Sequence, residues 1–72
     1  MNCFLVEVKS TSGDGIRIPF DWLSKIDKEA VMEGKKPAVA INFTNLDGSL
    51  VRNGAWVMVP EQVFADLISG EK

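Results

Sequence analysis

The segment FLVEVKSTSGDGIRIP, residues 4–19, determines how the chain can begin to fold. Its first six residues alternate with the period of a β-strand, so Val6 and Val8 point to one face and Glu7 and Lys9 to the other. The polar stretch that follows predicts a turn, and the last four residues, IRIP, predict a short second strand that pairs back in a hairpin. The segment therefore predicts a strand with one apolar face and one charged face.

A helix is predicted after this hairpin. Pro19 stops the second strand, Asp21 is an N-cap or first-turn acid, and Gly34 ends the helix before Pro37. The spacing of the apolar residues defines one stripe that we expect to pack against the sheet. This stripe consists of Trp22, Leu23, Ile26, Ala30 and Val31.

The C-terminal half predicts further strands and a second helix. Residues 37–43, PAVAINF, predict a buried strand, and residues 55–59, AWVMV, predict another. Pro60 opens a short helix that ends near Gly70. The order β-β-α-β-β-α predicts a single small α+β domain with a mixed sheet, residues 1–72. The hairpin turn signals are Asp47-Gly48 and Asn53-Gly54.

The composition limits the functions that the chain can have. A net charge of −2 means that contacts with nucleic acid must rest on a local cluster of basic residues. Cys3 is the only cysteine and histidine is absent, which excludes an intrachain disulfide and the usual zinc ligand sets. No apolar run approaches the roughly 18 residues of a membrane span, and no signal-peptide pattern is visible. We therefore expect a cytoplasmic protein with no membrane partner.

Glu7 and Lys9 form the motif that suggests chemistry. Both side chains project from one face about 6.5–7 Å apart, so they can act on one small object together. A carboxylate is a hard oxygen ligand for Mg²⁺, and an ammonium orients water or offsets charge on a phosphate. The competing interpretation is a solvated strand face with an ordinary charge pair. The tripeptide E-x-K alone does not decide between the two.

The order of features around this motif resembles the PD-(D/E)XK nuclease superfamily, in the branch of Holliday junction resolvases and related phage or archaeal endonucleases. There, an E-x-K strand is followed by small polar residues, a short strand ending near a proline, a helix and a buried apolar strand. Residues 4–43 carry the resemblance, and WVMVPEQVFADLI, residues 56–68, is similar to the family's closing strand and helix. The resemblance implies a truncated restriction-endonuclease-like core that cleaves branched or double-stranded DNA with Mg²⁺ or Mn²⁺.

The resemblance also implies roles for individual residues. Glu7 matches the metal-binding carboxylate, and the carbonyl of Val8 matches a backbone ligand of the metal. Lys9 matches the lysine that positions the attacking water, so Glu7 and Lys9 are the implied catalytic residues. Contacts with DNA are implied for Ser10, Thr11, Arg17, Lys25 and Lys28. For the last three of these residues, ordinary surface charge is the alternative.

Half of the family's active site has no counterpart in this sequence. The family has an aspartate on the strand before E-x-K, whereas the six residues before Glu7 contain no acid, and neither Asp14 nor Asp47 matches that position. A sheet that starts with the E-x-K strand has an unpaired edge. We therefore expect a homodimer or a protein partner that binds through the edge of the Glu7 strand. A fragment of a nuclease and a shortened, non-catalytic relative are the competing explanations.

Two classes of function follow. The first is a metal-dependent DNA endonuclease or resolvase-like domain, incomplete in itself or completed by dimerisation. The second is a non-catalytic accessory or inhibitor protein of phage type, built on a nuclease-derived scaffold, that binds a protein partner. A small α/β domain unrelated to nucleases is a third possibility, in which the charge pair is surface decoration.

Overall fold

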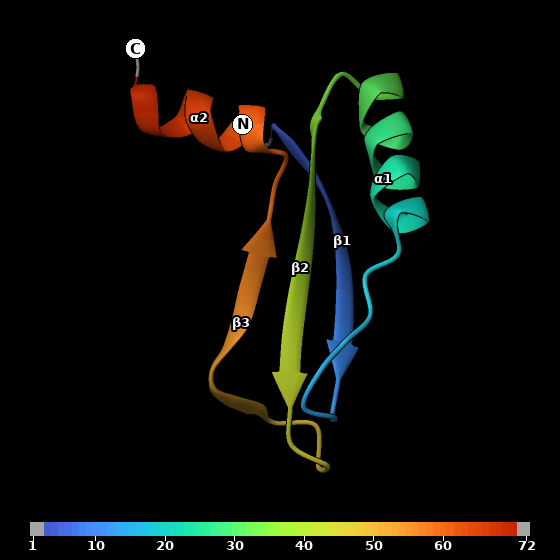
Figure 1. Ribbon diagram of the computed structural model, residues 1–72, viewed down its shortest axis with the longest axis vertical. Helices are drawn as coiled ribbons and strands as arrows, with labels where there is room; N and C mark the ends of the chain where they lie inside the picture. Colours follow the sequence, from blue (N-terminus) through green and yellow to red (C-terminus); the bar gives the residue numbers. More distant parts are fainter. Residues whose placement is uncertain (1–2, 71–72) are drawn as a thin grey trace.

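The chain forms a three-stranded sheet with two helices, in the order β1-α1-β2-β3-α2 (Figure 1). This computed structural model describes residues 3–70, so the two ends of the predicted 1–72 domain lie outside the described residues. The mixed sheet and the two helices confirm the predicted α+β class. The strands are β1 (Phe4–Thr11), β2 (Lys36–Thr44) and β3 (Leu50–Met58), and the helices are α1 (Phe20–Met32) and α2 (Glu61–Ser69).

The central strand of the sheet is β2. β1 pairs with it in parallel, with Glu7 opposite Val39 and Lys9 opposite Ile41. β3 pairs with its other side in antiparallel fashion, with Val57 opposite Ala40. α1 forms the crossover that a parallel pair of strands requires. Both β1 and β3 are therefore edge strands in the part of the chain that the structure describes.

The short second strand predicted at residues 16–19 is wrong. These residues belong to no strand, and β1 runs on to Thr11 instead. Ile16 and Ile18 pack their side chains against the core. The segment has to leave the plane of the sheet to reach the helix layer, so its apolar side chains line the core while its backbone stays out of the sheet. The observed order lacks the second strand of the predicted one.

α1 has the boundaries that the sequence predicts. Pro19 is the N-cap residue, and Asp21 lies in the first turn, where a negative charge interacts favourably with the helix dipole. Gly34 follows the helix with φ +68°, a conformation that glycine adopts without strain. In the predicted stripe, Ile26 is buried but Val31 is 70% exposed. Five residues rotate the helix by about 140° from Ile26, which turns Val31 away from the sheet.

α1 covers the face of the sheet that carries Leu5, Glu7 and Lys9. The core is a cluster of Ile26 from the helix with Val39 and Ile41 from β2. These two β2 residues are the partners of Glu7 and Lys9 across the parallel ladder, so the charge pair lies at the margin of the core. The opposite side of the sheet we call the open face. Its residues include Val6, Val8, Ala40, Ala55 and Val57.

The open face and α2 both expose apolar surface. Val8 on the open face is 58% exposed and Val57 is 66% exposed. α2 extends away from the sheet after Pro60 and does not lie over it (Figure 1). Val63 is the one buried residue of α2, and the other apolar residues of its stripe are exposed. These residues are Phe64, Leu67 and Ile68.

The hairpin between β2 and β3 has the turn that Asp47-Gly48 predicts. The backbone nitrogen of Asn45 donates to the carbonyl of Ser49 at 2.7 Å. A carboxylate oxygen of Asp47 accepts hydrogen bonds from the backbone nitrogen of Ser49 at 2.9 Å and from its hydroxyl at 2.7 Å. Gly48 has φ +93°. Asp47 therefore acts in the structure of this turn.

The second predicted turn, Asn53-Gly54, is wrong, because both residues lie inside β3. Between Asn42 and Thr44 on β2 the register of β3 shifts, and Asn53 has φ +56° within this irregularity. A residue in the left-handed backbone conformation, followed by glycine, is typical of a β-bulge as well as of a turn. Gly54 is buried there, and an added Cβ would lie 2.7 Å from the Phe43 carbonyl oxygen.

Candidate functional site

Glu7 and Lys9 meet on the covered face of β1, beside the first turn of α1. The Nζ atom of Lys9 is 3.4 Å from Oε2 of Glu7. The same Nζ atom lies 4.4 Å from the centre of the Trp22 ring, within the range of a cation–π contact. The Lys9 side chain is 30% exposed and that of Glu7 is 47% exposed. The ammonium is thus held between a carboxylate and an aromatic ring, and solvent reaches both charges.

The acids of one chain do not fit a Mg²⁺ or Mn²⁺ site by themselves. Within residues 3–70, no three or more Asp, Glu, Cys or His side chains form a group that could hold a metal ion. Val8 adds only its carbonyl, which lies in the plane of the sheet, whereas the Glu7 side chain stands out of that plane. A cation of this kind requires a near-octahedral set of oxygen ligands. Further ligands would have to come from outside this chain.

Ser10 and Thr11, the predicted DNA contacts on β1, lie on different faces. Ser10 is on the side of the open face, away from Glu7, because successive side chains of a strand alternate. Thr11 is on the covered face, and its Oγ1 accepts a hydrogen bond of 3.0 Å from the backbone nitrogen of Gly13. Its carbonyl accepts a hydrogen bond of 3.3 Å from the hydroxyl of Thr44. Thr11 therefore fixes the end of β1, and it shares a face with the charge pair.

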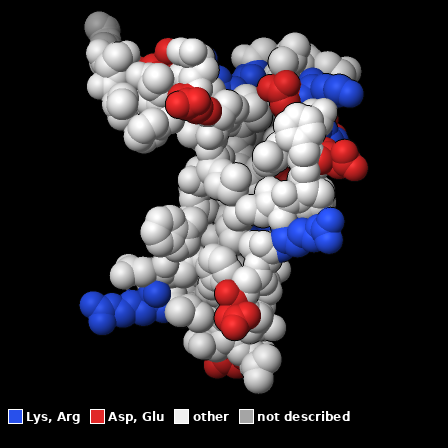
Figure 2. Space-filling view, in the orientation of Figure 1, with Lys and Arg blue, Asp and Glu red and all other residues white. Residues whose placement is uncertain are grey.

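The predicted basic contacts are exposed but do not gather into one cluster. Arg17 lies in the segment before α1, and Lys25 and Lys28 lie on the exposed surface of α1. A shallow depression on α1 has these two lysines beside Asp21 and Glu29, so positive and negative charges alternate there. Figure 2 shows charged side chains of both signs scattered over the face in view, with uncharged residues between them. Their contact with DNA stays a prediction.

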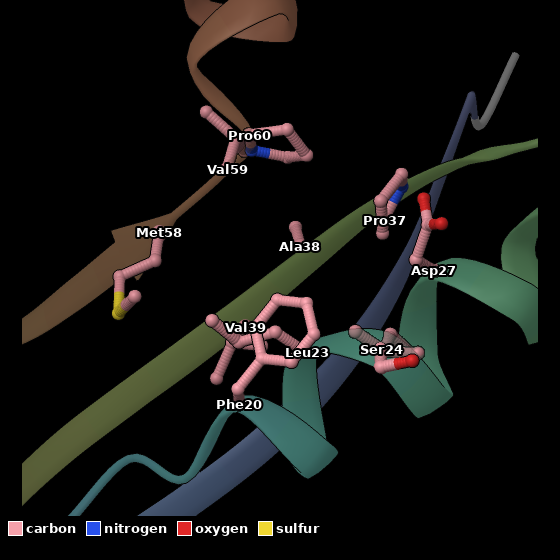
Figure 3. Close-up of a pocket in the computed structure, with 11 residues that line it drawn as sticks. Phe20, Leu23, Ser24, Asp27, Pro37, Ala38, Val39, Met58, Val59 and Pro60 are labelled. Atoms are coloured by element: carbon pink, nitrogen blue, oxygen red, sulfur yellow. The ribbon is translucent and has the colours of Figure 1, made fainter.

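An apolar groove lies where α1 stops covering the sheet (Figure 3). It has a volume of about 350 Å³ and runs between α1, the start of β2 and the link from β3 to α2. Ser24 and Asp27 contribute the polar side chains of its wall. None of the site residues predicted from the sequence lines it. No local sequence signal indicates such a groove, because it depends on how far α1 extends across the sheet.

Comparisons with protein-family models, with curated proteins and with solved structures found no match for this chain. The nuclease relationship therefore stays a hypothesis that rests on the order of sequence features. No helix among residues 3–70 is long and apolar enough to cross a membrane.

Proposed function

We propose that this chain is an incomplete metal-dependent DNA endonuclease domain of the resolvase type, which becomes competent when another strand pairs with the free edge of β1. The observation that carries the proposal is the position of the Glu7 and Lys9 pair. The two charged groups are 3.4 Å apart, accessible to solvent and located on an edge strand. A strand that extends the sheet at this edge brings its own side chains alongside them.

Lys9 has the better-defined role in this proposal. Its ammonium, held beside the Trp22 ring, is a preorganised positive charge that can orient a water molecule and offset charge on a phosphate. Glu7 contributes one carboxylate, and Mg²⁺ or Mn²⁺ is the cation whose ligand preference matches that group. Because one chain does not fit the metal, the missing acid has to arrive with the completing strand.

The geometry of strand pairing makes such completion feasible. An unpaired edge presents a row of backbone donors and acceptors that binds another extended chain. Side chains directly opposite each other across an antiparallel pair have Cβ atoms about 4.5–5.5 Å apart. A carboxylate carried at that distance from Glu7 reaches the same cation or phosphate. The exposed residues Arg17, Lys25 and Lys28 would then contact the DNA backbone without reading its sequence.

A cleavage assay tests the proposal. A labelled four-way DNA junction and a linear duplex are incubated with the chain and Mg²⁺ or Mn²⁺ over a wide range of protein concentration. We expect cleavage to rise more steeply than linearly with concentration, and both Glu7→Gln and Lys9→Ala to abolish it. The matched controls are Glu33→Gln and Lys35→Ala, which break an ion pair of similar length, 3.5 Å, and similar exposure. Cleavage that survives the Glu7 and Lys9 changes, or its absence with both metals at every concentration, contradicts the proposal.

A second candidate function is a non-catalytic accessory or inhibitor that binds a protein partner. The exposed apolar surface of the open face and of α2 favours it, since contiguous apolar patches mark interaction surfaces. In that case the chain would inhibit an active nuclease added to the same assay and would cleave nothing itself. Phe64→Asp would abolish the inhibition, whereas Glu7→Gln would leave it intact, so the two candidates depend on different residues.

A further inference from the structure

We propose that the strand that completes β1 is β1 of a second copy of this chain, paired in antiparallel fashion with Val8 on the two-fold axis. The inference rests on the proposed function in one respect, which is that another strand pairs with the free edge of β1. The register of the pairing follows from the residues of β1 themselves.

The outer edge of β1 is available for such pairing. β2 occupies one side of β1, and no described strand occupies the other. Residues 12–19 pass from the end of β1 to α1, yet no backbone hydrogen bond of the described chain joins them to Leu5–Thr11. The backbone from Leu5 to Thr11 therefore presents donors and acceptors along its outer side that no strand of the described chain pairs with.

Symmetry restricts the possible registers. Two identical strands that pair about a two-fold axis perpendicular to the sheet place one residue opposite its own copy. A register centred on Glu7 pairs positions 4–10 with each other, and one centred on Val8 pairs positions 5–11. Centres nearer either end of β1 leave more of the strand unpaired, and each such loss removes ladder hydrogen bonds.

The charges on β1 choose between these two registers. With Glu7 at the centre, its carboxylate lies directly opposite that of the second copy, and like charges in this position are destabilising. With Val8 at the centre, Glu7 lies opposite Lys9 of the second copy, and Lys9 lies opposite its Glu7. Two opposite-charge pairs therefore form on the covered face, in addition to the contact of 3.4 Å within each chain.

On the open face both registers cover valines, since a register centred on Glu7 would place Val6 opposite Val8 of the second copy, so the charges alone choose between them. In the register centred on Val8, that residue, 58% exposed in the single chain, meets its own copy at the axis. Val6, 47% exposed, lies opposite Ser10 of the second copy. The axis perpendicular to the sheet keeps both α1 helices on the same face of the extended sheet.

Dimerisation supplies the acid that one chain lacks. In the register centred on Val8, the two Glu7 residues become diagonal neighbours across the new strand pair, about 7–8 Å apart. Their side chains emerge on the same face, and each carboxylate has the Lys9 of its own chain and the Lys9 of the second copy as neighbours. Each copy thus contributes one carboxylate to a shared site, with a Lys9 on either side of it.

A charge-swap experiment tests the register through the mass of the particle, measured by sedimentation equilibrium. We expect the wild-type chain to form a dimer, and Glu7→Lys and Lys9→Glu each to weaken dimerisation at least tenfold by placing like charges opposite each other. The double variant Glu7→Lys/Lys9→Glu restores the opposite-charge pairs and is expected to restore the dimer. Circular dichroism verifies that each variant keeps its fold.

A cross-linking experiment tests the axis independently. In a Cys3→Ser background, Val8→Cys is expected to form an interchain disulfide on mild oxidation, because position 8 lies opposite itself. Val6→Cys, on the same face of β1, is the matched control and is expected not to cross-link, since it lies opposite position 10.

A monomeric wild-type chain, a double variant that stays monomeric, or equal cross-linking at positions 6 and 8 overturns the inference. These results do not depend on catalysis. A dimer with the expected register that cleaves no DNA would retain the inference and remove the proposed endonuclease function.

Discussion

The ammonium of Lys9 lies 4.4 Å from the centre of the Trp22 ring and thereby joins β1 to the first turn of α1. This contact sits directly beside the ion pair with Glu7, so one lysine links a carboxylate, a strand and a helix. The aromatic ring restricts the lysine without competing for its charge as a second carboxylate would.

The Lys9 and Trp22 contact is expected to contribute measurably to stability. Trp22→Leu removes the ring and Lys9→Met removes the charge, and the coupling between them in a double-mutant cycle should be about 0.5–1 kcal/mol. Urea unfolding followed by circular dichroism measures each variant. Lys35→Met, combined with Trp22→Leu, is the control, and its effect should be additive. Additive effects of the Lys9 and Trp22 changes would contradict the prediction.

Gly54 is expected to tolerate no side chain. An added Cβ would lie 2.7 Å from the carbonyl oxygen of Phe43 and 2.8 Å from that of Val51, so the backbone of β2 or β3 would have to move. Gly54→Ala should therefore lower the free energy of unfolding by about 1–3 kcal/mol, as overpacking does elsewhere. Gly15→Ala is the matched control, because nothing lies within 4 Å of its added Cβ. Equal unfolding midpoints for the two variants would contradict this prediction, because they would show that the backbone of β3 moves to accept the added Cβ at little cost.

α2 is expected to contribute little to the stability of the sheet. Phe64 is 55% exposed, so Phe64→Gln should change the free energy of unfolding by less than about 0.5 kcal/mol. Ile26, buried in the core, provides the contrast, because Ile26→Ala should cost about 2–5 kcal/mol. Chemical unfolding of both variants tests the difference. A large loss of stability in the Phe64 variant would mean that the apolar stripe of α2 is covered in solution.

The turn at Asp47 is expected to make stability depend on acidic pH. Hydrogen bonds from the Ser49 side chain, and then from its backbone, hold the pKa of Asp47 below the ordinary value of 3.8. A pKa lowered by folding stabilises the native state above the unfolded-state pKa, and this gain is lost as the pH falls through the folded-state pKa. Asp47→Asn should therefore lower the thermal midpoint at neutral pH, and the two proteins should converge below pH 3.8. A constant difference between their midpoints at all pH values would exclude this effect.

Local patterns predicted most of the elements but not how they meet. Alternation in residues 4–9 predicts β1. Pro19 and Gly34 predict the start and the end of α1. Each of these signals acts within a few residues of the chain. The period of two also predicts that Glu7 and Lys9 share one face of β1. Residues 16–19 carry the same alternation, yet they line the core without joining the sheet, since pairing depends on partners far along the chain. The contact with Trp22 depends on where α1 crosses β1, which no local pattern encodes.

The two faces of β1 illustrate the same limit for the site. Val6 and Val8 form the more apolar face, but α1 covers the face of Glu7 and Lys9, because Ile26, Val39 and Ile41 assemble there. The composition of one strand does not determine which face receives the helix.

The parallel pairing of β1 and β2 also sets an order of folding. Each residue of β1 pairs with a residue 32 positions later in the chain, whereas β2 and β3 are neighbours joined by a tight turn. Closing a short loop is fast, and contacts between distant residues form late. The hairpin of β2 and β3 is thus expected to form first, and β1 to dock last. During synthesis β1 emerges before β2 and β3. The strand that carries Glu7 and Lys9 is therefore exposed to incorrect pairing for longer than either of them.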